Sequence, residues 1–116
     1  MAAPTEDQEQ MAVAAFLNLS PMRDLWFHVP NGSHKSAAAA MRFQRLGLKS
    51  GVPDVLIIKP ARGYVGLAIE LKRTRGGVVS EAQKSWLDRF AACGWCARIC
   101  RGHIEAIETI RSVYGC

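Results

Sequence analysis

Residues 51–75 read GVPDVLIIKPARGYVGLAIELKRTR and contain two apolar runs that begin or end in charged residues. The runs at 54–59 and 65–72 are rich in Val, Ile and Leu, residues that favour strands. PARGY, the segment that separates them, carries the Pro and Gly typical of a turn. The stretch therefore predicts a β-hairpin.

The pairing of the two strands decides which charged residues meet. With the turn centred on Arg62, Asp54 lies opposite Glu70, and opposed residues of an antiparallel pair bring their Cβ atoms to about 4.5–5.5 Å. Side chains alternate along a strand, so Glu70 and Lys72 share one face. A bulge in the loop would shift this pairing by one residue.

Two carboxylates at this separation repel each other unless a cation lies between them. Mg²⁺ is bound by one or two carboxylates together with water and substrate phosphates, and Lys72 could orient or deprotonate a water molecule beside Asp54 and Glu70. Such a trio suits phosphodiester hydrolysis. The alternative is that Asp54 caps a strand end and that Glu70 and Lys72 form an incidental surface pair.

The rest of the chain predicts an α/β protein in the order α-β-α-β-β-α-β-α, a mixed sheet flanked by helices. Thr5 can cap a first helix that starts at Glu6 and ends before Pro21. The other predicted elements are a strand at 25–29, a helix at 36–46, a helix opening at Ser80, a strand at 95–100 and a helix at about 103–114. At 116 residues we expect a single domain over residues 1–116.

Positive charge is concentrated near the hairpin. The chain has 15 Lys and Arg residues against 10 Asp and Glu, a net charge of +5. Arg73 and Arg75 directly follow the hairpin, and Ala38, Met41 and Leu46 are expected to pack inward from the second helix. Four further bases recur along that helix and just beyond its ends, namely Lys35, Arg42, Arg45 and Lys49. These bases suit contacts with DNA phosphates; the alternative is a solvated basic surface.

Cys93, Cys96, Cys100 and His103 form the pattern C-x2-C-x3-C-x2-H, which is close to the spacing of zinc ligands. On the predicted strand, however, Cys96 and Cys100 would stand roughly 13 Å apart at about 3.3 Å per residue. No structural zinc is therefore expected, and free thiols fit an intracellular compartment. The N-terminus is acidic, unlike a signal peptide, and no apolar run approaches the ~18 residues of a membrane span.

Three segments, GVPDVLIIKP, GYVGLAIELK and SEAQKSWLDRF, together resemble the VRR-NUC family of the PD-(D/E)xK nuclease superfamily. The likeness extends over nearly the whole chain, including the Asn31–Gly32 turn. It implies a restriction-endonuclease-like fold and Mg²⁺- or Mn²⁺-dependent DNA cleavage. At the matching positions it implies Asp54 and Glu70 as metal ligands, the Leu71 carbonyl as a further ligand and Lys72 as the catalytic lysine.

The resemblance also implies active-site roles for Gln83 and for Glu6 on the first helix. Gln83 forms with Ser80 the S-x-x-Q pattern of a capping box, and the two roles are compatible. Glu9 is the alternative to Glu6, and either acid could instead only favour the helix N-terminus.

Free-standing members of this family resemble Holliday-junction resolvases, in which two active sites cut two strands. The resemblance therefore implies a structure-selective DNA endonuclease that resolves four-way junctions as a homodimer, inside a bacterial or virus-infected bacterial cell. Two alternatives remain. One is a non-catalytic DNA-binding protein that keeps the fold and a basic face, and the other is a nuclease that acts on single strands or RNA.

Overall fold

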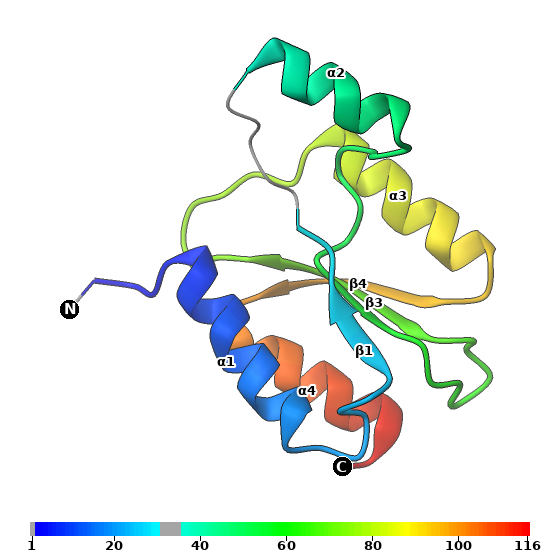
Figure 1. The fold of residues 1–116 in the computed structure, drawn as a ribbon. Coiled ribbons are helices and arrows are strands. Elements are labelled where there is room, and N and C mark those ends of the chain that lie inside the picture. Colours follow the sequence, from blue (N-terminus) through cyan, green and yellow to red (C-terminus); the bar gives the residue numbers. More distant parts are fainter. Residues whose placement is uncertain (1, 31–35) are drawn as a thin grey trace.

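The computed structural model describes residues 2–30 and 36–116, and its elements follow the predicted order (Figure 1). In chain order the elements are α1 (Glu6–Asn18), β1 (Trp26–His28), α2 (Ala37–Arg45), β2 (Val55–Ile57), β3 (Leu67–Lys72), α3 (Glu81–Ala92), β4 (Cys96–Arg101) and α4 (His103–Tyr114). The predicted α/β class and element order are confirmed. In the part of the chain that is described, no helix is both long and apolar enough to span a membrane.

Within the described residues the strands form one mixed sheet of four strands in the order β1-β2-β3-β4. β1, β2 and β3 pair antiparallel, whereas β4 lies parallel to β3. α3 supplies the crossover between the two parallel strands, as parallel pairing requires.

The hairpin has the predicted register over shorter strands. Val55 pairs with Ile69 and Ile57 with Leu67, so the next positions toward the open end are Asp54 and Glu70. The pairing of β2 with β3 ends at Ile57 and Leu67, and beyond it the amide of Val65 donates to the Gly94 carbonyl instead of pairing across the hairpin. The predicted runs 54–59 and 65–72 extend further, to Lys59 and Val65, which do not pair in the ladder.

Two helices start where local capping chemistry places them. Thr5 and Gln8 form a capping box at the start of α1, and Ser80 and Gln83 form one at the start of α3. Each box satisfies backbone N–H groups that the first turn leaves without partners. The predicted starts of both helices are confirmed.

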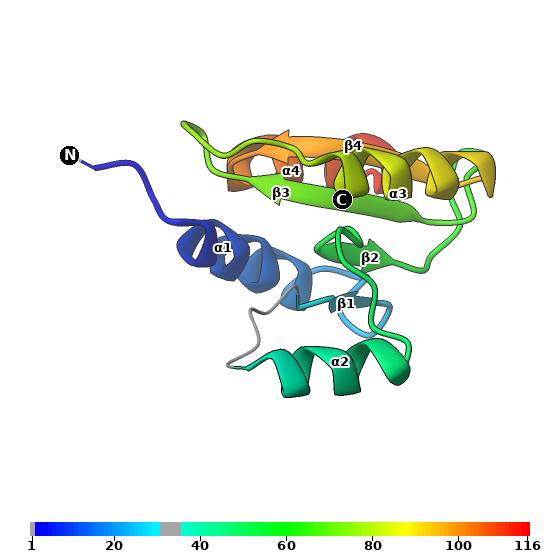
Figure 2. The same cartoon turned by 90° about the horizontal axis from the view of Figure 1, so that it is seen from above.

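The apolar core lies between the sheet and the pair α1 and α4. Both helices cover one face of the sheet, and α3 covers the other over β3 and β4 (Figures 1 and 2). Core residues on the strands alternate with residues that face α3. The core cluster includes Val13 and Leu17 of α1, Val55 and Ile57 of β2, Leu67, Ile69 and Leu71 of β3, Cys96 and Cys100 of β4, and Ala106, Ile110 and Val113 of α4.

The packing expected for α2 is wrong. None of the nine residues of α2, all of them described, is buried. Met41 and Leu46 are 54% and 71% exposed, and Ala38 is exposed as well. The helix stands beside the β1 edge of the sheet, away from the core (Figure 2). Its spacing of apolar residues therefore does not mark a core-facing stripe.

Candidate active site

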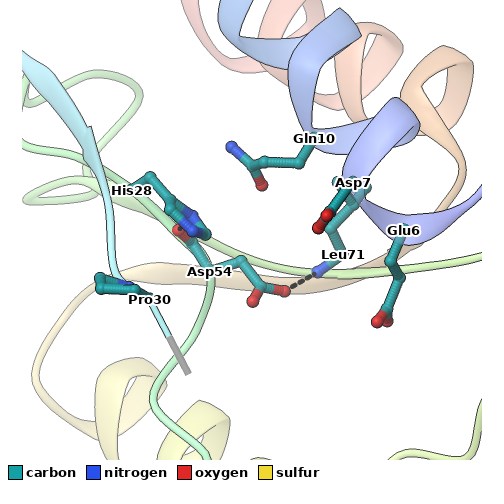
Figure 3. A pocket seen from close by; sticks show the side chains of 7 residues that line it. All are labelled: Glu6, Asp7, Gln10, His28, Pro30, Asp54 and Leu71. Atoms are coloured by element: carbon teal, nitrogen blue, oxygen red, sulfur yellow. Dashed lines mark hydrogen bonds between the residues drawn. The ribbon is translucent and has the colours of Figure 1, made fainter. Parts of the chain in front are cut away.

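The open end of the hairpin is organised by Asp54, which directly precedes β2. One carboxylate oxygen of Asp54, Oδ2, accepts a hydrogen bond of 2.7 Å from the Leu71 amide (Figure 3). The Asp54 side chain therefore continues the sheet bonding one residue beyond the β2 backbone.

This bond also orients the Leu71 carbonyl. The N–H and C=O of a strand residue point to the same side of the strand, so the Leu71 carbonyl lies on the Asp54 side. The carbonyl of the next residue, Lys72, faces β4, where it accepts the amide of Gly102 at 2.8 Å. The Leu71 carbonyl, expected as a backbone ligand, thus faces the side of β3 on which Asp54 lies.

Glu70 is a buried acid whose surroundings oppose its charge. It is 1% exposed. Its pKa is raised to about 9, mainly by burial and further by the neighbouring Asp54 side chain, while the Lys72 ammonium partly lowers it. One oxygen, Oε2, accepts a 3.3 Å hydrogen bond from Gln83. The other, Oε1, is buried and has no hydrogen-bond partner among the described residues.

Gln83 both closes the capping box of α3 and contacts Glu70. Its side-chain oxygen accepts the Ser80 amide at 2.9 Å and closes the capping box, while its Nε2 donates to Glu70. The start of α3 packs closely against the backbone at Gly51, because a Cβ on Gly51 would lie 2.8 Å from the Gln83 backbone nitrogen. The capping box therefore orients the amide that contacts the buried acid.

Lys72 and Glu6 meet at the end of β3. Lys72 is 7% exposed, and its Nζ lies 4.0 Å from the Glu6 carboxylate, which is half exposed. Glu9 has different surroundings: its carboxylate accepts from the backbone and ring of His103 at the start of α4. Of the two acids considered for the first helix, Glu6 is the one placed beside Lys72.

A pocket of about 300 Å³ opens beside Asp54 (Figure 3). The residues that line it are Glu6, Asp7, Gln10, His28, Pro30, Asp54 and Leu71. Asp7, Gln10 and His28 were not predicted as site residues. Gln10 lies one turn after Glu6 on the same helical face, which is a signal that could have identified it.

His28 and Gln10 bring polar nitrogens to this pocket. His28 Nδ1 lies 2.8 Å from the Asp54 carbonyl; because a carbonyl only accepts, Nδ1 carries the proton. Gln10 Nε2 is buried without a hydrogen-bond partner in the described ranges. Both groups are placed to contact a molecule that enters beside Asp54.

The hairpin end fits a hard divalent cation. Across residues 2–30 and 36–116, no three His, Cys, Asp and Glu side chains gather to hold a metal ion. A metal here would instead rest on the carboxylates of Asp54 and Glu70 and the Leu71 carbonyl. Oxygen donors are the ligands that Mg²⁺ and Mn²⁺ prefer, and the unpartnered Glu70 oxygen is a buried acceptor that such an ion would satisfy.

The bases predicted to contact DNA lie outside this cluster. Arg73 and Arg75 are exposed in the loop after β3, and Arg42, Arg45 and Lys49 are exposed on α2 and just after it. Lys35 lies outside the described residues. Asp54, Glu70, Lys72, Gln83 and Glu6 are thus brought together, and the described bases are exposed at the surface outside this cluster.

Comparison with known proteins identifies the family of the chain. The family model of the VRR-NUC domain matches residues 5–104. A solved structure described as a VRR_NUC domain protein is similar to the chain with a TM-score of 0.86 and 28% sequence identity, over 99% of this chain and 92% of that chain. No curated protein matches. With most of its length matched, the chain belongs to the VRR-NUC family of nuclease domains.

Proposed function

We propose that this nuclease-family protein is a divalent-metal-dependent DNA endonuclease. The observation that carries the proposal is the Glu70 carboxyl, which is 1% exposed at the open end of the hairpin beside Asp54; burial there raises its pKa to about 9. A group perturbed in this way by burial and a like charge is typical of a functional site. Without a cation, folding tolerates the pair because Glu70 keeps its proton, and a bound divalent cation would favour the ionised form of both carboxylates.

The residues at the open end of the hairpin have different roles in the proposed reaction. Asp54, Glu70 and the Leu71 carbonyl would hold Mg²⁺ or Mn²⁺. When bound, such an ion lowers the pKa of an attacking water and neutralises charge on the phosphate. Lys72 aligns the water for in-line attack on phosphorus, Glu6 steadies the Lys72 ammonium, and Gln83 keeps the Glu70 carboxylate oriented. The expected products carry a 3′-hydroxyl and a 5′-phosphate.

Branched DNA is the proposed substrate, with recognition of shape rather than of base sequence. The exposed bases Arg42, Arg45, Lys49, Arg73 and Arg75 supply phosphate contacts, which position DNA without reading sequence. Cutting a four-way junction requires two cuts, and we propose that a homodimer supplies the two active sites.

The first prediction is that purified protein cleaves DNA with Mg²⁺ or Mn²⁺ and not with EDTA. Four-way junctions, flaps, duplexes and single strands are compared, and junctions are expected to be cut fastest. Lys72→Ala should lower cleavage about 100-fold, because misplacing a reacting group by about 1 Å can cost about 10²-fold. Lys84→Ala, which removes an exposed lysine paired with Glu81, is the matched control and should cleave normally.

The rival functions give different results in the same assay. A non-catalytic DNA-binding protein would bind without metal and yield no product, and Lys72→Ala would leave its binding unchanged. A nuclease for single strands or RNA would cut those substrates faster than any branched duplex. Either outcome would overturn the proposed function.

A further inference from the structure

We propose that Glu9 is a positioning residue of the active site, which holds the strand end bearing Lys72 and the helix bearing Glu6 in one arrangement. This inference rests on the proposed function. It assigns to Glu9 a role different from the direct active-site role for which Glu9 was the alternative to Glu6.

Glu9 is buried, with 1% of its surface exposed. Its Oε2 accepts the backbone amide of His103, the first residue of α4, and its Oε1 lies 3.1 Å from the His103 ring Nδ1. The preceding residue, Gly102, makes no side-chain cap for α4. The Glu9 carboxylate therefore takes the place of the missing cap, from a helix 94 positions away in the chain.

Gly102 links this carboxylate to Lys72. The Gly102 amide donates to the Lys72 carbonyl at 2.8 Å. A Cβ on Gly102 would lie 2.7 Å from the Glu9 Oε2 and 2.6 Å from Thr74 Cγ2, so a side chain there would displace the Glu9 carboxylate and Thr74. Gly102 also has a φ of +88°, which glycine adopts at little cost. The corner between β4 and α4 is thus held to both Glu9 and β3.

The same carboxylate sets the position of α1. Glu6 lies one turn before Glu9 on this helix, and its carboxylate is 4.0 Å from Lys72 Nζ. α1 and α4 pack against each other on the same face of the sheet (Figure 1). A displacement of Glu9 would therefore move both groups of the Lys72–Glu6 pair relative to each other.

The contacts of Glu9 argue against a direct role at the metal. Both of its oxygens are engaged by His103 at the start of α4. Glu9 therefore acts through the Gly102–His103 corner and not on the reacting atoms.

Two substitutions distinguish the effect of the length of the Glu9 side chain from the effect of its charge. Glu9→Gln keeps the length of the side chain and an oxygen that accepts the His103 amide, but it has no charge. Glu9→Asp keeps the charge but is shorter by one methylene, so the carboxylate no longer reaches the corner. Val13→Ala is the control, because it removes buried volume from α1 one turn further on and leaves the corner untouched.

Amide hydrogen exchange on the metal-free protein is the first readout. Glu9→Asp should accelerate exchange of the Gly102 and His103 amides at least about tenfold relative to the core strand β3, while Glu9→Gln should change it little. Val13→Ala should not single out these two amides. Unchanged protection in Glu9→Asp would overturn the proposal, and this experiment is decisive even if the protein cleaves no DNA.

Steady-state kinetics well below the melting temperatures are the second readout. Glu9→Asp should lower kcat about 10- to 100-fold with little change in KM, the scale of loss that a misplacement of about 1 Å can cause. Glu9→Gln should stay within a few-fold of the original kcat. An equal loss in both variants would mean that the charge acts directly at the metal, and unchanged kcat in both would mean that Glu9 serves stability alone. Either result would overturn the inference, whereas absence of cleavage by the unaltered protein would overturn the proposed function.

Discussion

At the scale of single residues, the site is governed by acids that occupy contrasting environments. Glu70 is buried beside Asp54 and retains an unpartnered oxygen within the described part of the chain. Glu9 is equally buried, but both of its oxygens are hydrogen-bonded. Glu6 is exposed and lies beside Lys72. The environment of each carboxyl, and not its residue type, therefore assigns its role.

The raised pKa of Glu70 predicts how stability depends on pH in EDTA. The folded protein holds this proton up to about pH 9, whereas the unfolded chain releases it near 4.5. Between these values the unfolded state binds fewer protons, so the contribution of Glu70 to stability falls as pH rises. Glu70→Gln removes that dependence and keeps an acceptor for Gln83.

Thermal melts of both proteins from pH 5 to pH 9 test this prediction. Glu70→Gln should melt several degrees higher than the unaltered protein at pH 9, and the difference should shrink toward pH 5. A constant difference across the range would show that the Glu70 carboxyl does not titrate as described.

At the scale of elements, the hairpin and α3 build the site while α2 stands apart. Strand alternation directs Glu70 toward α3, where the capping box presents Gln83. α2 has exposed apolar residues and basic residues but no buried side chain. A helix with little packing of its own is suited to act as a surface for a large ligand.

We predict that α2 contributes phosphate contacts. The double variant Arg42→Gln, Arg45→Gln should bind DNA more weakly. The slope of log K against log salt concentration should become shallower by up to about 1.8, because each phosphate contact on duplex DNA contributes about 0.9 to its magnitude. The melting temperature should change little because both side chains are exposed. Arg89→Gln on α3 is the control, and an equal effect in that variant would refute a specific role for α2.

At the scale of the whole molecule, one chain presents one cluster of Asp54, Glu70 and Lys72. The proposed cutting of two strands at a junction therefore depends on a second copy. Gel filtration with light scattering should give the mass of a dimer at concentrations that support cleavage. A monomer that still resolves four-way junctions would defeat this prediction.

Much of the site could be predicted because its information is local. The turn around Arg62 set the pairing that brings Asp54 opposite Glu70, and the period of two placed Lys72 on the Glu70 face. Ser80 and Gln83 are three residues apart, so their capping box follows from spacing alone. The predicted strands were too long because the alternating apolar pattern continues past the last paired residues.

The amino-acid sequence alone determined the order of the elements, the hairpin register and the meeting of its acids, since these depend on neighbours along the chain. Its apolar spacing misplaced α2, whose exposure depends on where the sheet ends. The partnership of Glu9 with His103, and the approach of His28 to Asp54, join segments far apart in the chain. Such contacts arise only when helices and strands pack, because no periodicity specifies which distant residue a buried carboxylate or a ring nitrogen will meet.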